Sequence, residues 1–536
     1  MKKTVCFFLG LIMVLSVFVI APLSVNAATV VTMVEATVPT PVVGATISQT
    51  AQCTSPTQGV TLTKLNWTTE NGAIYSNDTK FQAGVTYYCD MEFWVEDGYT
   101  FPDHYTKLAG YINGKVGEIS TVYYTDHAYV VVAFTPTKAG DVYVGGVGIT
   151  DGDYLPQDSE TVTKTKPASD CYAYYKNGVL TLHDYSYTGV GFVLSRDRFD
   201  YAGMVYSNQS ITVMLEGGTT LKGTCASLKT VGIWLEGDGA AVNGTKDSAL
   251  SVDVSCVGIY SYNSFNMTNC TAYIFGGVYG MQQSNGDCNI QGSQVVISAK
   301  EIGILTADSI IVTNSALTVV SVNGHGLYCS EDITLTESTV SLTADTCAAY
   351  ALVGRIVVRD CDLSFIGEYG LVNDLYDITI ADSTINGIAY TCGIYAVDGN
   401  IAIDNTELHV RAISEDPEDD CYVFYVDNGS IYFGNGLIVY AATTLDGEFV
   451  PYQAEDNDSY RRVLITKGGH YLWGDVDMDG KITAADALDV LKNVVGKVSF
   501  TDQQKDLADT DRNAKVDAAD ALEILKHVVG KPSAIG

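Results

Sequence analysis

Apolar and polar positions in the middle of the chain, between about residues 255 and 425, repeat every 21 to 23 residues. Each step carries a glycine followed by an apolar residue, as at Gly258-Ile259 and Gly393-Ile394, and Ala349-Tyr350 occupies the step that lacks the glycine. Three further columns follow at fixed offsets. The first apolar column is Phe265, Cys288, Ile310, Ile333, Ile356, Ile378 and Ile401; the second is Met267, Ile290, Val312, Leu335, Val358, Ile380 and Ile403; and a column of small residues is Cys270, Ser293, Ser315, Ser338, Cys361, Ser383 and Thr406.

The two apolar columns lie two residues apart, and this alternation predicts β-strands. Three short strands fill a solenoid coil of this length, and equivalent apolar positions then stack coil upon coil into a continuous interior. We therefore predict a right-handed parallel β-helix over residues 139–465, with regular coils over residues 255–425. A leucine-rich repeat has a similar period, but it requires a Leu-x-x-Leu-x-Leu signature and helical segments that these repeats lack.

The region before the repeats alternates in a different way. Runs such as Tyr87 to Val95 and Tyr129 to Phe134 are separated by turn residues such as Asp97-Gly98. This pattern predicts an antiparallel, immunoglobulin-like β-sandwich over residues 30–138. Cys53 and Cys89 are one candidate disulfide within it. The spacing of the cysteines does not fix their connectivity, so this pair is not assigned. The predicted fold class is thus mainly β, with a small helical C-terminal domain.

The first 27 residues have the features of a secretory signal peptide: Lys2 and Lys3, an apolar run from Val5 to Val19, and a small-residue end before Ala28. We therefore expect a secreted, extracellular protein. No later segment has about 18 uninterrupted apolar residues, so no transmembrane anchor is expected. Removing Lys2 and Lys3 takes the net charge from −33 to −35. So negative a chain is not expected to bind nucleic acid.

Two acidic twelve-residue segments near the C-terminus share one pattern of oxygen-bearing side chains, 34 residues apart. Oxygen ligands at loop positions 1, 3, 5, 9 and 12, with a main-chain carbonyl at position 7, are how such a loop surrounds Ca²⁺. The sequence therefore predicts two calcium sites. Their ligands are Asp475, Asp477, Asp479, Lys481, Thr483 and Asp486 in the first loop and Asp509, Asp511, Asn513, Lys515, Asp517 and Asp520 in the second, with the lysines contributing carbonyls. Position 6 is Gly480 in the first loop but Ala514 in the second, and we expect the second site to bind more weakly.

Each loop is followed by an apolar helical pattern, Ala487 to Gly496 and Ala521 to Gly530, whose last glycine suits a left-handed helix end. This duplicated loop and helix, over residues 472–536 and without a leading helix, resembles a type I dockerin. The resemblance implies calcium-dependent docking onto a cohesin domain of a scaffoldin. It also implies that loop positions 10 and 11 and the following helix contact the cohesin. These residues are Ala484, Ala485, Leu488 and Lys492, with Ala518, Ala519, Leu522 and Lys526 as the repeat-related set.

The order of a β-sandwich, Gly-Ile repeats and a dockerin resembles a group of secreted clostridial-type carbohydrate-binding β-helix proteins. This resemblance implies a component of a cellulosome-type assembly, attached to the cell surface through a scaffoldin, whose β-helix binds plant cell-wall polysaccharide. Two alternatives stay open. One is a polysaccharide-degrading enzyme, either a glycoside hydrolase or a polysaccharide lyase, and the other is a non-catalytic adhesin or spacer.

No catalytic signature is complete, and the catalytic residues are unassigned. Gly324-His325-Gly326 occurs without the paired aspartates and the Arg-x-Lys of a polygalacturonase-like hydrolase. Arg355 and Arg359 should both point outward from the solenoid, where a solvated surface is the simplest interpretation. Surface carboxylates such as Asp374 could bridge through Ca²⁺ to an anionic polysaccharide. Trp234 and the 35 tyrosines offer flat faces on which sugars can stack.

Overall fold

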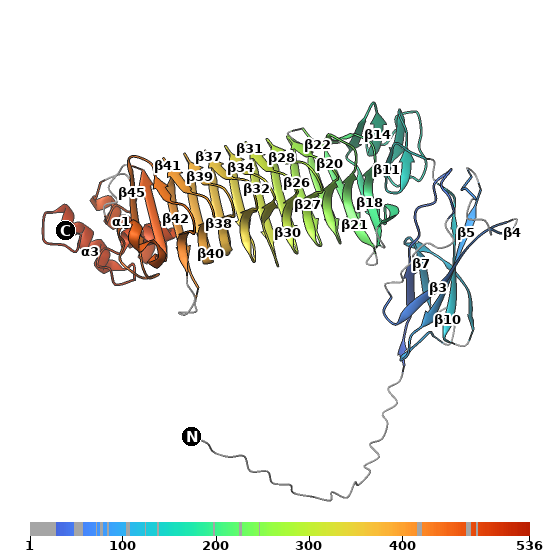
Figure 1. Ribbon diagram of the computed structural model, residues 1–536, viewed down its shortest axis with the longest axis horizontal. Coiled ribbons are helices and arrows are strands. Elements are labelled where there is room, and N and C mark those ends of the chain that lie inside the picture. The colour runs from blue at the N-terminus through green and yellow to red at the C-terminus, as the bar shows by residue number, and fades with distance from the viewer. Residues whose placement is uncertain are drawn as a thin grey trace, which may run out of the picture.

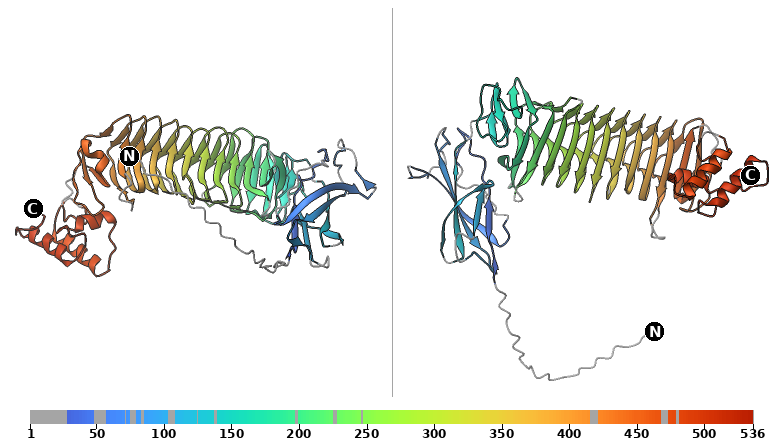
Figure 2. Two further views of the ribbon diagram at one scale, coloured as in Figure 1. Left: turned by 60° about the horizontal axis from the view of Figure 1, so that its bottom comes forward. Right: turned by 180° about the vertical axis from the view of Figure 1, so that it is seen from behind.

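Three parts follow one another along the chain: small β-sheets near the N-terminus, a long solenoid of stacked strands, and a helical C-terminal part (Figure 1). Two further views show the stack of rungs continuing from the N-terminal sheets to the C-terminal helices (Figure 2). The predicted mainly-β fold, with a parallel β-helix and a small helical domain, is confirmed. The predicted signal peptide lies outside the described residues. The computed structural model describes residues 28–47, 57–70, 72–74, 79–82, 85–102, 108–123, 125–136, 139–196, 199–224, 228–245, 247–414, 421–467, 473–478 and 481–535.

The N-terminal part contains a five-stranded antiparallel sheet and two smaller sheets around one core. Alternate residues of β5, including Cys89 and Phe93, are buried in that core. The smaller sheets depart from the predicted all-antiparallel pairing, because β2 pairs in parallel with β7 after a crossover through the larger sheet. The immunoglobulin-like topology and the Cys53–Cys89 disulfide stay predictions, since Cys53 lies outside the described residues. In sheet order, the strands are β4 (Gly72–Ala73), β3 (Val60–Thr69), β5 (Tyr87–Val95), β10 (His127–Phe134) and β9 (Glu118–Tyr123); β2 (Met33–Ala36), β7 (Ala109–Ile112) and β8 (Lys115–Val116); and β1 (Thr29–Val30) with β6 (Tyr99–Thr100).

One long sheet of the solenoid receives a single strand from each regular coil. Its pairing is parallel from β15 to β44, while β13, β14 and β15 pair antiparallel and form a cap at the N-terminal end. The parallel pairing thus begins before, and ends after, the regular coils predicted over residues 255–425. In sheet order, the strands are β13 (Asp153–Pro156), β14 (Tyr172–Lys176), β15 (Val179–His183), β19 (Thr212–Glu216), β22 (Ala240–Asn243), β25 (Phe265–Thr268), β28 (Cys288–Gln291), β31 (Ile310–Thr313), β34 (Ile333–Thr336), β37 (Ile356–Arg359), β39 (Ile378–Ala381), β41 (Ile401–Asp404) and β44 (Ile431–Phe433).

The other long sheet receives two strands from most coils, and these merge into one strand in β38 and β40. At its C-terminal end β45, β46 and β47 pair antiparallel and close the stack. A 3₁₀ helix, η2 (Ala454–Ser459), precedes β47. The strands are β11 (Val142–Val144), β12 (Val147–Ile149), β16 (Ser186–Gly189), β17 (Phe192–Arg196), β18 (Phe199–Ser207), β20 (Gly218–Gly223), β21 (Lys229–Leu235), β23 (Ala249–Val254), β24 (Val257–Ser261), β26 (Thr271–Gly276), β27 (Tyr279–Gln283), β29 (Gln294–Ala299), β30 (Ile302–Thr306), β32 (Ala316–Ser321), β33 (Leu327–Cys329), β35 (Thr339–Thr343), β36 (Cys347–Ala351), β38 (Asp362–Asn373), β40 (Thr384–Ala396), β42 (Glu407–Ala412), β43 (Tyr422–Val426), β45 (Leu437–Ala442), β46 (Val450–Pro451) and β47 (Arg462–Lys467).

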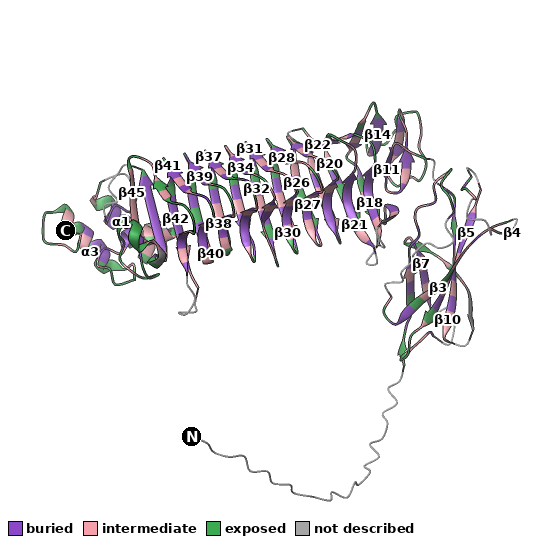
Figure 3. Cartoon of the chain, in the orientation of Figure 1, coloured by how far each residue is buried: buried purple, intermediate pink, exposed green. Residues whose placement is uncertain are grey.

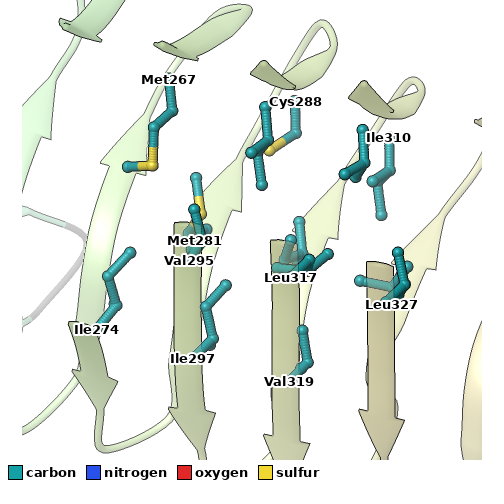
Figure 4. Packing of buried hydrophobic residues seen from close by; sticks show 14 of the residues in the cluster. Met267, Ile274, Met281, Cys288, Val295, Ile297, Ile310, Leu317, Val319 and Leu327 are labelled. Carbon is teal, nitrogen blue, oxygen red and sulfur yellow. The ribbon is translucent and has the colours of Figure 1, made fainter. Parts of the chain in front are cut away.

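The interior of the solenoid is the stack of apolar columns that the repeats predict. Both columns pair in register from β25 to β41, and every member is buried. Buried and exposed positions alternate along the strands (Figure 3), and side chains such as Met267, Ile274 and Ile297 fill the interior (Figure 4). Burying one such side chain contributes roughly 1.5–3 kcal/mol, so the stack is the main source of stability in this part of the chain.

One detail of the predicted repeat is wrong by a single residue. The step without glycine is Ala348-Ala349 rather than Ala349-Tyr350, because Ala349 pairs with Leu327 on one side and Leu371 on the other. The glycine positions are crowded: a Cβ added at Gly326 would lie 2.5 Å from the carbonyl oxygen of Ala348. Only a residue with little or no side chain fits there. Tyr350 therefore occupies the next position, which points outward.

The column of small residues forms a ladder of hydrogen bonds at one corner of the coils. The Ser315 hydroxyl accepts the main-chain N–H of Ser293 at 3.2 Å and donates to the carbonyl of Thr313 at 2.8 Å. Ser338 repeats both contacts one coil later, with distances of 3.1 and 2.7 Å. Buried polar groups need such partners. Small hydroxyl side chains therefore suit this corner, since they satisfy the main chain that turns there.

Among its described residues, the C-terminal part contains three helices: α1 (Ala484–Val494), α2 (Asp502–Ala508) and α3 (Ala518–Val528). α1 and α3 follow the two loops and end as predicted, at Gly496 and Gly530 with φ of 70° and 68°. α2 was not predicted, so the second loop does have a leading helix. Its start carries a recognisable pattern, because the Thr501 hydroxyl accepts the N–H of Gln504 and the Gln504 side chain accepts the N–H of Thr501.

Candidate functional site

The first acidic loop brings three of its predicted ligands together. Carboxylate oxygens of Asp475, Asp477 and Asp486 lie within 4.8 Å of one another. Asp486 is fully buried, and its Oδ1 accepts two loop amides at 2.7 and 3.1 Å while Oδ2 accepts the N–H of Thr483 at 2.8 Å. Carboxylates this close repel one another unless a cation lies between them. These side chains therefore fit a calcium ion. The predicted ligand Asp479 lies outside the described residues.

The second loop repeats this arrangement. Carboxylate oxygens of Asp509, Asp511 and Asp520 also lie within 4.8 Å of one another. Asp509 accepts the main-chain N–H of Asn513 at 3.0 Å and of Ala514 at 2.9 Å. Burial raises the pKa of Asp509 and of Asp520, and the charge of Asp511 raises both pKa values further. A bound divalent cation would oppose this effect by favouring the ionised carboxylates.

Loop position 9 has a second task in both loops, because it caps the helix that follows. The Thr483 hydroxyl accepts the N–H of Ala485 at 3.0 Å, and the Asp517 carboxylate accepts the N–H of Ala519 at 2.7 Å. The side chain at position 12 accepts the N–H of position 9 in return, which completes a capping box at the start of α1 and of α3. The metal loop and the helix start are therefore one structural unit. The side chains of Lys481 and Lys515, whose carbonyls are the predicted position 7 ligands, are exposed.

Backbone geometry distinguishes the two loops at position 6. Ala514 has φ of 62°, in the left-handed region where a Cβ is unfavourable. Arg512 and Met478, at position 4 of their loops, share that conformation, with φ of 62° and 60°. The strain at Ala514 supports the expectation that the second site binds calcium more weakly. Gly480, the equivalent of Ala514, lies outside the described residues.

The predicted cohesin contacts lie on two similar exposed surfaces, one on each loop-helix repeat. Ala484, Ala485 and Leu488 are exposed, as are Ala518, Ala519 and Leu522, whereas Lys492 and Lys526 are half-buried beside Asp489 and Glu523. Each surface extends further than predicted, over apolar residues that the helical period places on the same side. The added residues are Leu491 and Val494 on α1 and Leu525 and Val528 on α3, together with the C-cap residues Val495 and Val529, with 38–66 % of each side chain exposed.

The helix α2 packs against the C-terminal end of the β-helix and forms an interdomain joint of ion pairs. Arg411 of β42 contacts Asp502 at 2.6 Å, and the buried Arg462 of β47 contacts Asp506. His409, also buried, lies 3.6 Å from Asp506. Burial and the two arginines lower the pKa of His409 to about 4. The joint uses α2 and leaves the exposed faces of α1 and α3 free of these contacts.

A strip of aromatic side chains runs along the outer face of the 24-stranded sheet. Main-chain pairing continues without interruption from Trp234 to Tyr425. The residue after each inward-facing apolar residue points outward, and most of these residues are half-buried tyrosines. A second column lies three residues earlier, on the same strands or, for His325, just before one. We call these two columns the tyrosine strip; its aromatic members are Tyr260, Tyr328, Tyr350, Tyr395 and Tyr425, with Tyr279, His325, Tyr369 and Tyr422 in the second column.

The residues considered for catalysis do not meet in one place. Arg355 and Arg359 are exposed beside the buried Ile356 and Val358, as predicted, but they lie on β37 and its edge in the other sheet. His325 belongs to the tyrosine strip, where its Nδ1 lies 3.0 Å from the Thr346 hydroxyl and burial lowers its pKa. The basic pair and the histidine therefore lie on different faces, and no catalytic residue is assigned.

Residues 473–529 match the family model described as dockerin type I domain. The chain carries a type I dockerin at its C-terminus. This family binds calcium, which agrees with the acidic clusters in both loops. Searches of curated proteins and of solved structures gave no match for the chain. Within the described parts of the chain, no helix is long and apolar enough to span a membrane.

Proposed function

We propose that this chain is a secreted component of a cellulosome-type assembly, which docks through its dockerin onto a cohesin domain of a scaffoldin and is thereby held at the cell surface. The observation that carries this proposal is the type I dockerin match over residues 473–529. The duplicated acidic loops supply the calcium ligands that this docking requires. Removal of the ion is expected to abolish docking, because the same residues cap α1 and α3.

The exposed faces of α1 and α3 support docking through these helices. Apolar patches on a protein surface are unfavourable in water and commonly mark sites of protein contact. The alanines at loop positions 10 and 11 would let a partner approach the main chain closely. Lys492 and Lys526 lie at the edge of the two patches. Charged groups at the rim of an interface contribute more to the orientation of the bound partner than to its affinity.

A binding measurement with a full-length chain and a type I cohesin tests the docking proposal. We expect titration calorimetry to show binding in Ca²⁺ and none after chelation. Because there are two similar faces, the test variant changes both, Leu488→Asp with Leu522→Asp, and we expect binding to fall by at least about a hundredfold. Val353→Asp is the matched control, since Val353 is also exposed but lies on a β-helix turn. Unchanged binding by the double variant would contradict the proposed faces.

We further propose that the β-helix presents a surface for plant cell-wall polysaccharide. Its support is the tyrosine strip, because aromatic rings stack on the apolar faces of sugars. A polysaccharide-degrading enzyme and a surface spacer are the alternatives. Incubation of the full chain with wall polysaccharides separates them: retention without new reducing or unsaturated ends is expected here, new ends would indicate an enzyme, and no retention would indicate a spacer.

A further inference from the structure

Each coil places its outward residue over that of the coil before, so the tyrosine strip follows one line along the solenoid, although its first column carries Gln282, Leu305 and Val372 in three of the coils. Neighbouring strands lie about 4.8 Å apart, so the strip offers one contact position per coil along the solenoid axis. Rings at its centre touch one another: the centroids of Tyr328 and Tyr350 lie 5.3 Å apart at 79°, and His325 lies 5.2 Å from Tyr328. Mutual packing holds these rings in fixed orientations. Rigid rings lose little conformational entropy on binding a ligand.

The strip opens into a groove of about 690 Å³ at its N-terminal end. Trp234 lies in its floor, and Tyr201 and Tyr260 contact the indole edge to face, at 5.7 and 6.0 Å. Tyr260 also shares a hydrogen bond of 2.8 Å with the Ser284 hydroxyl, so the groove combines aromatic faces with hydroxyl groups. Sites with mostly apolar walls and a few fixed polar groups are typical of small-molecule and sugar recognition.

Carboxylates lie beside the C-terminal half of the strip. Asp374 accepts the hydroxyl of Tyr350 at 2.7 Å, and Asp427 accepts the hydroxyl of Tyr395 at 3.4 Å. Glu368 precedes Tyr369, and burial together with the Glu368 charge raises the pKa of Tyr369. Ionised carboxylates accept strong hydrogen bonds from hydroxyl donors and repel other anions. The chemistry beside the rings therefore favours a ligand with many hydroxyls and no negative charge.

We propose that the tyrosine strip binds an extended, neutral polysaccharide chain, which lies along the solenoid axis with its apolar sugar faces on the rings and its hydroxyls toward the carboxylates. This inference rests on the proposed polysaccharide-binding function and names its site and ligand class. A uronate polymer is disfavoured because its carboxylates would lie against Asp374, Asp427 and Glu368 unless Ca²⁺ bridged them, and Lys229 of the groove lies several coils away from these carboxylates. The exposed arginines of β37 lie on the other sheet and cannot compensate those charges.

Affinity electrophoresis of the full-length chain in Ca²⁺ tests the proposal, with gels containing a neutral glucan, xylan or mannan, or polygalacturonate. We expect retardation by at least one neutral polymer and none by polygalacturonate. The test variant is Tyr328→Ala with Tyr350→Ala. We expect it to weaken retention by at least about tenfold, since the contact with each ring contributes on the order of three- to tenfold in affinity. The control is Tyr273→Ala with Phe275→Ala, because these exposed aromatic residues lie on β26, outside the strip.

A second variant keeps every ring and changes only the charge: Asp374→Asn with Asp427→Asn. We expect it to gain affinity for polygalacturonate relative to the parent chain, and thermal unfolding will show that it is folded. Retention by polygalacturonate alone in the parent chain would overturn this inference but leave the polysaccharide-binding proposal standing. Loss of neutral binding in the Tyr273 and Phe275 variant alone would also overturn it. If no polymer is retained, the proposed binding function itself fails.

Discussion

The β-helix and the dockerin are both built from repeats, but the repeats stabilise them by different means. In the β-helix, residues such as Ile333 and Ile356 stack in register and bury a continuous apolar interior over many coils. In the dockerin, two repeats share a core of a few residues, among them Val490 and Ile524, and much of each loop is acidic. A repeat that stacks over many coils can therefore be stabilised by burial of apolar side chains alone. Two copies of a short unit bury too little apolar surface and depend on a bound ion for stability.

Chelation of Ca²⁺ should separate the two parts most strongly. We expect the dockerin to unfold in the presence of a chelator, because the carboxylates of each loop then repel one another, while the β-helix stays folded. Circular dichroism at the helical signal, or calorimetry, should lose one transition and keep the other. Two unchanged transitions would contradict the calcium assignment to Asp475, Asp477, Asp486 and their counterparts.

A cavity in the interior of the β-helix should destabilise the β-helix and leave the dockerin unchanged, which is the reverse of the effect of chelation. We expect Ile333→Ala to destabilise the β-helix by about 2–4 kcal/mol, since Ile333 is fully buried between neighbouring coils, and to leave the dockerin transition unchanged. Denaturant unfolding of the full chain measures this difference. The control is Val357→Ala, which removes a half-buried, outward-facing side chain from the same sheet. Equal losses for the two variants would contradict the predicted interior.

The interdomain joint should weaken as the pH falls. His409 has a pKa of about 4 in the closed joint, whereas an exposed histidine titrates near 6.5. Between these pH values, His409 binds a proton in the open joint but not in the closed joint. The free energy that favours the closed joint therefore falls by about 2 kcal/mol between pH 7 and pH 5. Burial raises the pKa of Asp506, which opposes this trend toward the acidic end of the range.

Fluorescence energy transfer between labels on the β-helix and on the dockerin measures this opening. The variant His409→Gln should show a flatter pH response in the same range, because it cannot take up the proton. Arg411 and Arg462, which also face His409, oppose its protonation, whereas the carboxylate of Asp502 favours it. A pH response that is identical in the variant would show that another group controls the joint.

The smallest expected effect distinguishes the two loops of the dockerin. Replacing Ala514 by glycine should relieve the left-handed strain and stabilise the second loop by about 1 kcal/mol, which corresponds to roughly fivefold tighter calcium binding. Calcium titration followed by calorimetry measures it. Ala518→Gly is the control, since it replaces a helical alanine and should destabilise instead. A loss of affinity in Ala514→Gly would contradict the strain argument.

Much of the fold could be predicted because each coil repeats the same residue types at the same positions. The columns that contain Ile310 and Val312 were predicted residue by residue, since a period of two within a longer period has few structural solutions. The acidic loops were predicted for a similar reason: oxygen ligands need fixed spacing. The helix α2 was not predicted although Thr501 and Gln504 form a capping box, because its seven residues, Asp502–Ala508, are polar except at the C-terminal end and show no apolar helical period.

The tyrosine strip and the interdomain joint could not be predicted from spacing alone. A tyrosine directly follows the glycine and apolar pair at Gly258-Ile259 and at Gly393-Ile394, so part of the strip is visible in the sequence. The alignment of its rings depends on the register of every coil, including those where Gln282, Leu305 or Val372 takes the place of an aromatic residue. The joint pairs Arg462 with Asp506 across a domain boundary, and such charge pairs have no local pattern.

The joint also has a mechanical consequence. A domain on a flexible linker explores a volume that grows with linker length, and the effective concentration of its binding surface falls accordingly. The ion pairs from α2 to β42 and β47 instead fix the β-helix relative to the dockerin. A cohesin bound to α1 or α3 would therefore set the direction of the solenoid as well as its position. The long axis of the β-helix would then hold a fixed orientation relative to the scaffoldin.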